Sequence, residues 1–245
     1  MAMRRGVERD ARWGVIADDV TGACDVAAEL RADGLDVAVV LGVPDPADLP
    51  RDADVVVAGL GTRTAPRERA VAESLATARA LAAAGYGRWY QKYCSTFDST
   101  DDGMIGPVAE ALLAEAGLDG SAGTPATPHA DRTVYRGHLF VGDRLLSESS
   151  LAHHPLTPMT DPDLVRVLAR QSELPVGSIP LRTVHAGPAA VAAELVAAPP
   201  HALLDALDDA DLDVLAAALD PDEGDAPRRL AGGGAGLMAA LGRRV

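Results

Sequence analysis

The sequence predicts an α/β fold, in which a parallel sheet is flanked by helices on both faces. Short apolar runs typical of buried strands alternate with alanine-rich segments of helical length. Apolar residues make up 48% of the 245 residues and aromatic residues only 3%, so small aliphatic side chains must fill the core. A chain of this length buries a core as one large domain or as two small ones.

The first predicted unit is a strand, a loop and a helix. Trp13–Ala17 is an apolar run, residues 18–22 read Asp-Asp-Val-Thr-Gly, and Ala23–Arg31 has the composition of a helix. Val37–Leu41 and Val55–Ala58 then predict two more buried strands. Strands that are joined through helices favour parallel pairing.

The alternation continues along most of the chain. In order, we expect a helix at Arg67–Ala84, a strand at Arg88–Tyr93, a helix that has Pro107 in its first turn and runs to Glu115, a helix at Asp161–Gln171 with Asp161 as its N-cap, a strand at Val176–Ile179, a helix at Pro188–Ala197 and a mostly helical segment at Leu203–Leu219. In sheets of this kind, ligands bind at the carboxyl ends of the strands.

The middle of the chain departs from this pattern near residues 132–148. Thr133–Arg136 and Leu139–Val141 are short extended runs separated by a glycine turn. We therefore expect an antiparallel hairpin excursion, which would form a flap. Tyr135 and His138 would then either close over a ligand or lie exposed.

The composition excludes some classes of function. The formal net charge of -14 argues against a nucleic-acid partner, because no basic surface is present to release phosphate counterions. No run approaches the length of about 20 apolar residues that a membrane span needs, and Met1–Arg12 lacks the apolar core of a signal peptide. The two cysteines, Cys24 and Cys94, have no metal-like spacing, which favours reduced thiols in a cytoplasmic protein.

Lys92 is the only lysine among the 22 Lys and Arg residues. The Ala- and Arg-rich composition indicates that arginine has replaced lysine wherever arginine can fill the same role. A lysine that is retained therefore marks a position where arginine cannot fill that role. An ammonium is a compact point charge that can lie against one oxygen of an anion, whereas guanidinium is a planar fork. Lys92 opens the polar run 92–103, which we interpret as a site for a small, oxygen-rich anion. Chance survival of a surface lysine is the alternative.

Polar side chains also follow two other predicted strands. Asp18 and Asp19 can accept hydrogen bonds from a polyol, act as a general base, or hold Mg²⁺ through water. The alternative is that Asp19 or Thr21 caps the next helix. Arg63 can bind a carboxylate bidentately or lie solvated at the surface. The adjacent aspartates do not match a haloacid-dehalogenase-type phosphatase, which has one residue between its two aspartates.

The loop after Lys92 carries the strongest signal. Lys92 can neutralise a carboxylate, and Asp98 can accept a hydrogen bond from a sugar-acid hydroxyl or deprotonate it. Ser99 and the neighbouring hydroxyl side chains can bond further oxygens. The alternative is an ordinary polar turn in which Asp101 or Asp102 caps the following helix.

Two other motifs are weak. His153 and His154 lack the further ligands of a metal site, and we expect no metal bound by this chain. Gly232–Gly236 resembles a phosphate loop in composition only, because the Lys-Ser/Thr pair of a P-loop is absent.

Several stretches carry a family resemblance. They are residues 16–23 (IADDVTGA), 90–100 (YQKYCSTFDST), 105–107 (IGP), 132–148 (RTVYRGHLFVGDRLLSE), 154–161 (HPLTPMTD) and 231–236 (AGGGAG). On these residues the chain resembles the four-carbon acid sugar kinase family, and within it the 3-oxo-tetronate kinases. The stretches cover most of the first 180 residues, and the long middle motifs are the specific ones.

The resemblance implies an ATP-dependent kinase whose first domain binds the sugar acid and whose second domain binds the nucleotide, with Mg²⁺ arriving with ATP. The implied product is a 4-phosphorylated four-carbon sugar acid. Carried over residue by residue, the substrate-binding residues are Asp18, Asp19, Arg63, Lys92, Asp98 and Ser99, and the catalytic base is one of Asp18, Asp19 and Asp98.

Two departures from the family leave alternatives open. The nucleotide domain should begin near Val245, so we expect residues 1–219 to be the substrate-binding domain and residues 220–245 to be a linker and the start of a missing nucleotide-binding domain. Asp102 and Met104 stand where the family has arginine and asparagine, and a carboxylate in place of a cation weakens anion binding. The alternatives are an inactive remnant or acid-binding module, an enzyme completed by a separate nucleotide-domain chain, and a metal-dependent hydrolase. The expected partners are a small-molecule sugar acid and either such a separate chain or further copies in a homo-oligomer.

Overall fold

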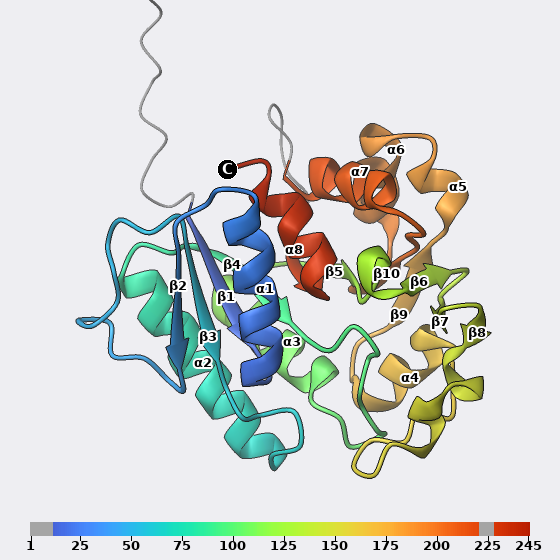
Figure 1. Ribbon diagram of the computed structural model, residues 1–245, viewed down its shortest axis with the longest axis horizontal. Coiled ribbons are helices and arrows are strands. Elements are labelled where there is room, and N and C mark those ends of the chain that lie inside the picture. Colours follow the sequence, from blue (N-terminus) through green and yellow to red (C-terminus); the bar gives the residue numbers. More distant parts are fainter. Residues whose placement is uncertain (1–11, 221–227) are drawn as a thin grey trace, which may run out of the picture.

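Eight parallel strands form the sheet that the sequence predicts. The structure, a computed structural model, describes residues 12–220 and 228–245 (Figure 1). The strands lie in the order β2-β3-β1-β4-β11-β5-β10-β9, and all neighbours are parallel. Their bounds are β1 Trp13–Ala17, β2 Val37–Leu41, β3 Val55–Gly59, β4 Arg88–Lys92, β5 Gly120–Thr124, β9 Val176–Ile179, β10 His201–Leu204 and β11 Arg229–Gly233.

Helices cover both faces of this sheet, as predicted (Figure 1). One face carries α1 Val20–Ala32, α5 Leu181–Val184, α6 Pro188–Ala197, α7 Asp209–Leu219 and α8 Ala235–Gly242, and the other carries α2 Arg67–Ala83, α3 Ile105–Ala116 and α4 Leu164–Gln171. Successive residues of β1 alternate between the faces, since Val15 packs with the α1 side and Ile16 with the α2 side. In the described part of the chain, no helix has the length and apolar character needed to cross a lipid bilayer.

The predicted antiparallel excursion forms a second, three-stranded sheet. Its strands are β6 Arg132–Tyr135, β7 His138–Val141 and β8 Arg144–Leu145. Arg136 and Gly137, which join β6 to β7, have positive φ angles of 52° and 71°, the conformation of a tight hairpin turn. The buried Asp205 carboxylate accepts hydrogen bonds from both backbone N–H groups, at 2.7 and 2.9 Å. It therefore ties the hairpin to the end of β10.

Three inner strands escape recognition in the sequence, two of them because they hold few large apolar residues. β5 reads Gly-Ser-Ala-Gly-Thr and β11 reads Arg-Leu-Ala-Gly-Gly. β10 reaches into the Leu203–Leu219 segment that was expected to be mostly helical, and α7 begins only at Asp209. The glycines are required by close strand packing, since a Cβ on Gly123 would lie 1.9 Å from the Gly232 carbonyl oxygen. Glycine at such positions hides a strand from sequence patterns.

The fold continues past the expected domain boundary at residue 219. β11 lies between β4 and β5, where Ala231 pairs with Tyr90 on one side and with Ala122 on the other. α8 is buried and packs on α1 and α7. Residues 221–227 of the expected linker lie outside the described residues. The prediction that residues 220–245 begin another domain is wrong for residues 229–242, which belong to this sheet and its helical layer.

The predicted cap at Asp161 is wrong, and the alternative in which Asp101 or Asp102 caps the next helix is not observed. Asp163, not Asp161, caps α4 by accepting the N–H three residues ahead at 3.1 Å. Asp161 lies outside the helix and accepts arginine side chains instead. Met104 occupies the N-cap of α3, so neither Asp101 nor Asp102 caps that helix. The aspartates of this loop are therefore not explained by helix capping.

A chain that ends at residue 219 should not fold, because it lacks the strand that joins the two halves of the sheet and leaves β4 and β5 with unpaired edges. We expect no cooperative thermal transition by circular dichroism. A matched chain that ends at Gly242 loses only the last three residues, whose ion pairs to Asp33 and Asp213 are at the surface and contribute about 1 kcal/mol or less each. It should unfold close to the full-length chain. Cooperative unfolding of the shorter chain would contradict the position of β11.

Candidate functional site

Three strand ends bring the predicted site residues to one edge of the sheet. β1 lies between β3 and β4 in register, so the carboxyl ends of the three strands coincide. Asp18 and Asp19 follow β1, Arg63 lies in the loop after β3, and Lys92 is the last residue of β4. The three loops therefore open onto the same edge of the sheet, where ligands of such folds bind.

The Arg63 guanidinium joins the two aspartates. Its Nε and Nη2 donate to the two Asp18 carboxylate oxygens at 2.9 and 2.8 Å, and its Nη1 lies 2.9 Å from Asp19 Oδ2. The other Asp19 oxygen accepts the Gly22 N–H at 2.7 Å and caps α1. Arg63 therefore neutralises carboxylates of its own chain, and the fork that we expected for a ligand carboxylate is occupied by Asp18.

Burial and pairing act on this cluster in opposite directions. Loss of hydration raises the pKa of Asp18, while the charges of Arg63 and Lys92 oppose that rise. Desolvation is the largest single influence on Arg63 and disfavours its charge, but the hydrogen bond to Asp18 and the negative charges around the guanidinium together outweigh it and raise the pKa of Arg63. A protonated Asp18 would give up its bidentate, charge-assisted bonds. The geometry therefore supports an ionised pair.

Lys92 is a buried ammonium that forms no salt bridge within residues 12–220 and 228–245. Its side chain is 3% exposed, and Nζ donates to the Tyr93 carbonyl oxygen at 2.7 Å. An ammonium has three N–H donors, and burying one with a single hydrogen bond and no direct ion pair is costly. Helix α1 comes close because residue 22 is glycine, where a Cβ would lie 2.8 Å from Nζ. The environment of Lys92 therefore suits an anionic ligand.

A left-handed turn directs the loop after β4. Phe97 has a φ of 56°, which non-glycine residues rarely adopt, and its buried ring packs edge-to-face on Tyr93 with centroids 5.4 Å apart. The next residue, Asp98, accepts the Thr96 hydroxyl at 2.6 Å. Thr96 Oγ1 also lies 2.9 Å from Cys94 Sγ. The packed aromatic pair thus fixes the position from which Asp98 projects.

Three cavities meet at Arg63. The inner pocket, of about 20 Å³, is lined by five predicted site residues, Asp18, Arg63, Lys92, Asp98 and Ser99. The α1 cleft, of about 340 Å³, is lined by Asp19, Arg63, Lys92, Ser95, Thr127 and His129, among others. The α2 cleft, of about 540 Å³, is lined by Arg63, Arg67, Ser99, Thr100, Asp102 and Thr157, among others. The inner pocket has room for about one water-sized group, so a larger ligand must lie in a cleft and reach inward.

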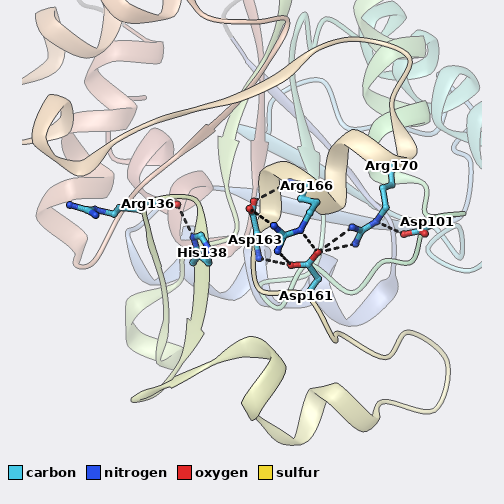
Figure 2. A network of polar contacts seen from close by, with 7 residues as sticks. All are labelled: Asp101, Arg136, His138, Asp161, Asp163, Arg166 and Arg170. Carbon is cyan, nitrogen blue, oxygen red and sulfur yellow. Dashed lines mark hydrogen bonds and ion pairs between the residues drawn. The ribbon is translucent and has the colours of Figure 1, made fainter.

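Other residues singled out in the sequence lie elsewhere. Tyr135 and His138 line none of these three cavities, and His138 Nδ1 lies 2.8 Å from the Arg136 carbonyl oxygen (Figure 2). His154 Nδ1 is engaged by Thr157. In the part of the chain that the structure describes, no group of three or more His, Cys, Asp and Glu side chains is placed to hold a metal ion.

One contact of the site was missed in the sequence. Gln171, the last residue of α4, donates to Ser99 Oγ at 2.6 Å although the two residues are 72 positions apart. No local pattern marks such a contact, because it depends on how α4 packs beside the loop.

Arg63→Met should destabilise the fold, because it leaves two half-buried carboxylates side by side without their cation. We expect the free energy of unfolding at pH 7 to fall by about 3–5 kcal/mol, measured by urea denaturation. The loss should shrink as the pH falls toward about 4, because protonation removes the repulsion. Arg69→Met removes an exposed arginine paired with Glu73 and should cost less than about 1 kcal/mol. Equal losses in the two variants would contradict the role of Arg63.

Cys94 should react more slowly than Cys24 near neutral pH. Burial raises the pKa of the Cys94 thiol, and the charge of Asp98 adds to that rise, whereas Cys24 is exposed. Only the thiolate is alkylated efficiently. Mass spectrometry after iodoacetamide treatment at about pH 7 and about pH 9 should show Cys94 gaining on Cys24 at the higher pH. Asp98→Asn should speed the alkylation of Cys94, and an unchanged rate would rule out the coupling.

Comparison with known proteins agrees with this geometry. The model of the family described as "Sugar-binding N-terminal domain" matches residues 13–241. The chain is 49% identical over 205 residues to a Cupriavidus necator protein named 3-oxo-tetronate kinase, covering 81% of this chain and 48% of that protein. It is 47% identical over 233 residues to the Burkholderia multivorans protein of the same name, covering 93% and 53%. The chain thus spans about half the length of the curated relatives it matches.

Two solved structures share the fold. A Haemophilus influenzae protein is 41% identical with a TM-score of 0.87, over 94% of this chain and 55% of that one. A Bordetella bronchiseptica protein, described as a domain-swapped dimer with bound citrate, is 32% identical with a TM-score of 0.77, over 94% and 55%. The family match extends over β11 and α8, as the sheet topology requires. The chain therefore belongs to the family of sugar-binding N-terminal domains and is homologous to the N-terminal half of 3-oxo-tetronate kinases.

Proposed function

We propose that this chain is the substrate-binding part of an ATP-dependent kinase that converts a 3-oxo-tetronate into its 4-phosphate. The names of the relatives support the reaction class. The observation that carries the proposal is Lys92, a buried ammonium bonded only to a backbone carbonyl among the described residues. It lies at the sheet edge where ligands of such folds bind. The carboxylate of a sugar acid would supply the direct ion pair that Lys92 lacks among the described residues.

Lys92 binds the carboxylate in this proposal, and Arg63 acts on the aspartates. Lys92 lines both the inner pocket and the α1 cleft, so an acid in that cleft reaches it directly. Arg63 holds Asp18 and Asp19 in place through three of its N–H groups. The two carboxylates accept hydrogen bonds from hydroxyl groups of the acid with their remaining lone pairs.

Asp98 is the candidate base for the terminal hydroxyl. Every carboxylate oxygen of Asp18 and Asp19 already accepts a bond from Arg63 or the start of α1. Asp98 has one oxygen bonded by Thr96 and a second with no hydrogen bond from the described residues. It lines the inner pocket with Lys92. A carboxylate with a free oxygen is the better placed to accept the hydroxyl proton as the phosphoryl group is transferred.

A bound acid in a relative supports an acid site. The Bordetella bronchiseptica structure contains citrate, which shares carboxylate and hydroxyl groups with the tetronates. For this chain, we propose that the sugar acid lies in the α1 cleft and places its carboxylate against Lys92, which lines both that cleft and the inner pocket.

ATP and Mg²⁺ belong to the intact enzyme in this proposal. Phosphoryl transfer depends on a positioned γ-phosphate and on neutralisation of its charge. This chain spans about half the length of its relatives, and no metal-holding cluster occurs among the residues that the structure describes. We therefore assign the nucleotide and its metal to the other half of such a protein, supplied by the same polypeptide or by a separate chain.

A module that binds the acid without transferring phosphate is the second candidate. Asp102, which replaces an arginine implied by the family resemblance, is exposed and lines the α2 cleft beside Arg67. It does not line the inner pocket. A carboxylate there opposes an anion in the α2 cleft while leaving Lys92 untouched. That placement favours a loss of transfer over a loss of acid binding.

Lys92→Met should abolish most of the acid binding. Isothermal titration of the chain with 3-oxo-tetronates should show binding that weakens at least about tenfold in the variant, since a hydrogen bond to a charged group contributes about 1.5–3 kcal/mol. Arg69→Met removes the same unit of charge far from the site and serves as the control. Unchanged affinity in the Lys92 variant would overturn the assignment.

The same titration, followed by an assay for phosphate transfer, separates the two candidates. Acid binding together with phosphate transfer, once Mg·ATP and a nucleotide-domain chain from a relative are added, supports the kinase. Acid binding without transfer under those conditions supports the binding module.

A further inference from the structure

Gln171 is a buried amide that contacts the predicted substrate loop directly. It is 3% exposed, and its Nε2 donates to Ser99 Oγ at 2.6 Å and to the Thr100 carbonyl oxygen at 3.0 Å. Its Oε1 accepts the Gly106 N–H at 3.4 Å. One side chain of α4 therefore bonds the loop after β4 at two points and the first turn of α3 at a third.

These partners fix the orientation of the amide. The Thr100 carbonyl can only accept, so it faces the Gln171 NH₂ group, and the Gly106 N–H can only donate, so it faces the oxygen. Ser99 must then accept from Gln171. A serine hydroxyl has a single proton to donate, and this arrangement leaves that proton free for another partner.

Ser99 is placed to use that proton on a ligand. Its side chain is buried and lines both the inner pocket and the α2 cleft, while its backbone N–H is held by Met159 Sδ at 3.3 Å. Gly103 leaves the room that this pair needs, since a Cβ there would lie 1.8 Å from Ser99 Oγ and 2.7 Å from Gln171 Nε2. The Ser99 hydroxyl is therefore bonded by Gln171 on one side and borders the inner pocket on the other.

We infer that Gln171 is a positioning residue that makes Ser99 a dedicated hydrogen-bond donor to an anionic oxygen of the bound acid. The inference rests on the proposed acid-binding function. Gln171 does not touch the ligand. It acts by occupying an acceptor lone pair of Ser99, so that the hydroxyl proton points into the inner pocket toward the oxygens that Lys92 also attracts.

The neighbouring Arg170 provides a contrast on the same turn of α4. It bonds Asp101 at 2.6 Å and also reaches Asp161, which Arg166 contacts as well (Figure 2). The Arg170 and Asp101 side chains are 37% and 70% exposed, and ion pairs at the surface contribute little. Arg170 therefore holds the outside of the loop weakly, whereas Gln171 sets a buried hydrogen bond beside the pocket.

The test is a double-mutant cycle on the full chain, with the affinity for 3-oxo-tetronates measured by calorimetry. Gln171→Met keeps the size of the side chain and removes its donor, and Ser99→Ala removes the hydroxyl. We expect each single variant to weaken binding about tenfold, and the double variant to be no weaker than Ser99→Ala alone. Arg170→Met is the matched control and should bind within about twofold of the wild type.

Two outcomes would overturn this inference and leave the proposed acid-binding function intact. One is an unchanged affinity in Gln171→Met, and the other is a loss that persists in full on the Ser99→Ala background, which would mark a structural role. Absence of acid binding by the wild-type chain would overturn the proposed function, and this inference with it.

A crystal structure of Gln171→Met supplies a readout that needs no ligand. We expect Ser99 to leave its present rotamer in this variant and to keep it in Arg170→Met. An unmoved Ser99 in Gln171→Met would contradict the positioning role even if the affinity fell.

Discussion

The bidentate bond between Arg63 and Asp18 is the interaction on which the site depends. Asp18 and Asp19 follow one strand and would repel each other at this distance, and the guanidinium from a second strand end removes that repulsion. The same loops are also joined through their backbones, since the N–H groups of Thr62 and Arg63 donate to the Asp18 carbonyl oxygen at 2.9 and 3.2 Å. The acidic groups are thus held by the sheet edge itself, which favours a preformed site.

The topology of the sheet explains why a crevice opens at Lys92. β1 leads into α1 on one face, and its neighbour β4 leads into α3 on the other. Where adjacent strands send their helices to opposite faces, the loops separate and leave room for a ligand. β11, on the other side of β4, leads into α8, which packs beside α1. Lys92 ends the strand at this division, so its ammonium is both enclosed by packed elements and open to the crevice.

Much of the fold could be predicted from the sequence, because Val-rich strands and the polar loops that follow them are local patterns. The strands β5 and β11 could not, since their glycines serve packing against a neighbouring strand that only the folded sheet supplies. The approach of Asp18, Arg63 and Lys92 followed from parallel pairing alone. The bonding of Arg63 to Asp18 could not be predicted, because an arginine at a strand end can bind either a ligand or a carboxylate of its own chain. The bond of Gln171 to Ser99 depends on the packing of α4, which no motif encodes.

The position of β11 also has a consequence for how the molecule comes into being on the ribosome. β4 and β5 leave the exit tunnel long before the strand that must lie between them, whose residues pair with Tyr90 and Ala122 on its two sides. Until then the nascent chain carries two open strand edges and cannot close its central layer, and pairing across such a sequence distance is slow. Edges of this kind recruit other chains. Synthesis of this protein therefore passes through a stage in which the open edges of β4 and β5 must be kept from pairing with strands of other chains.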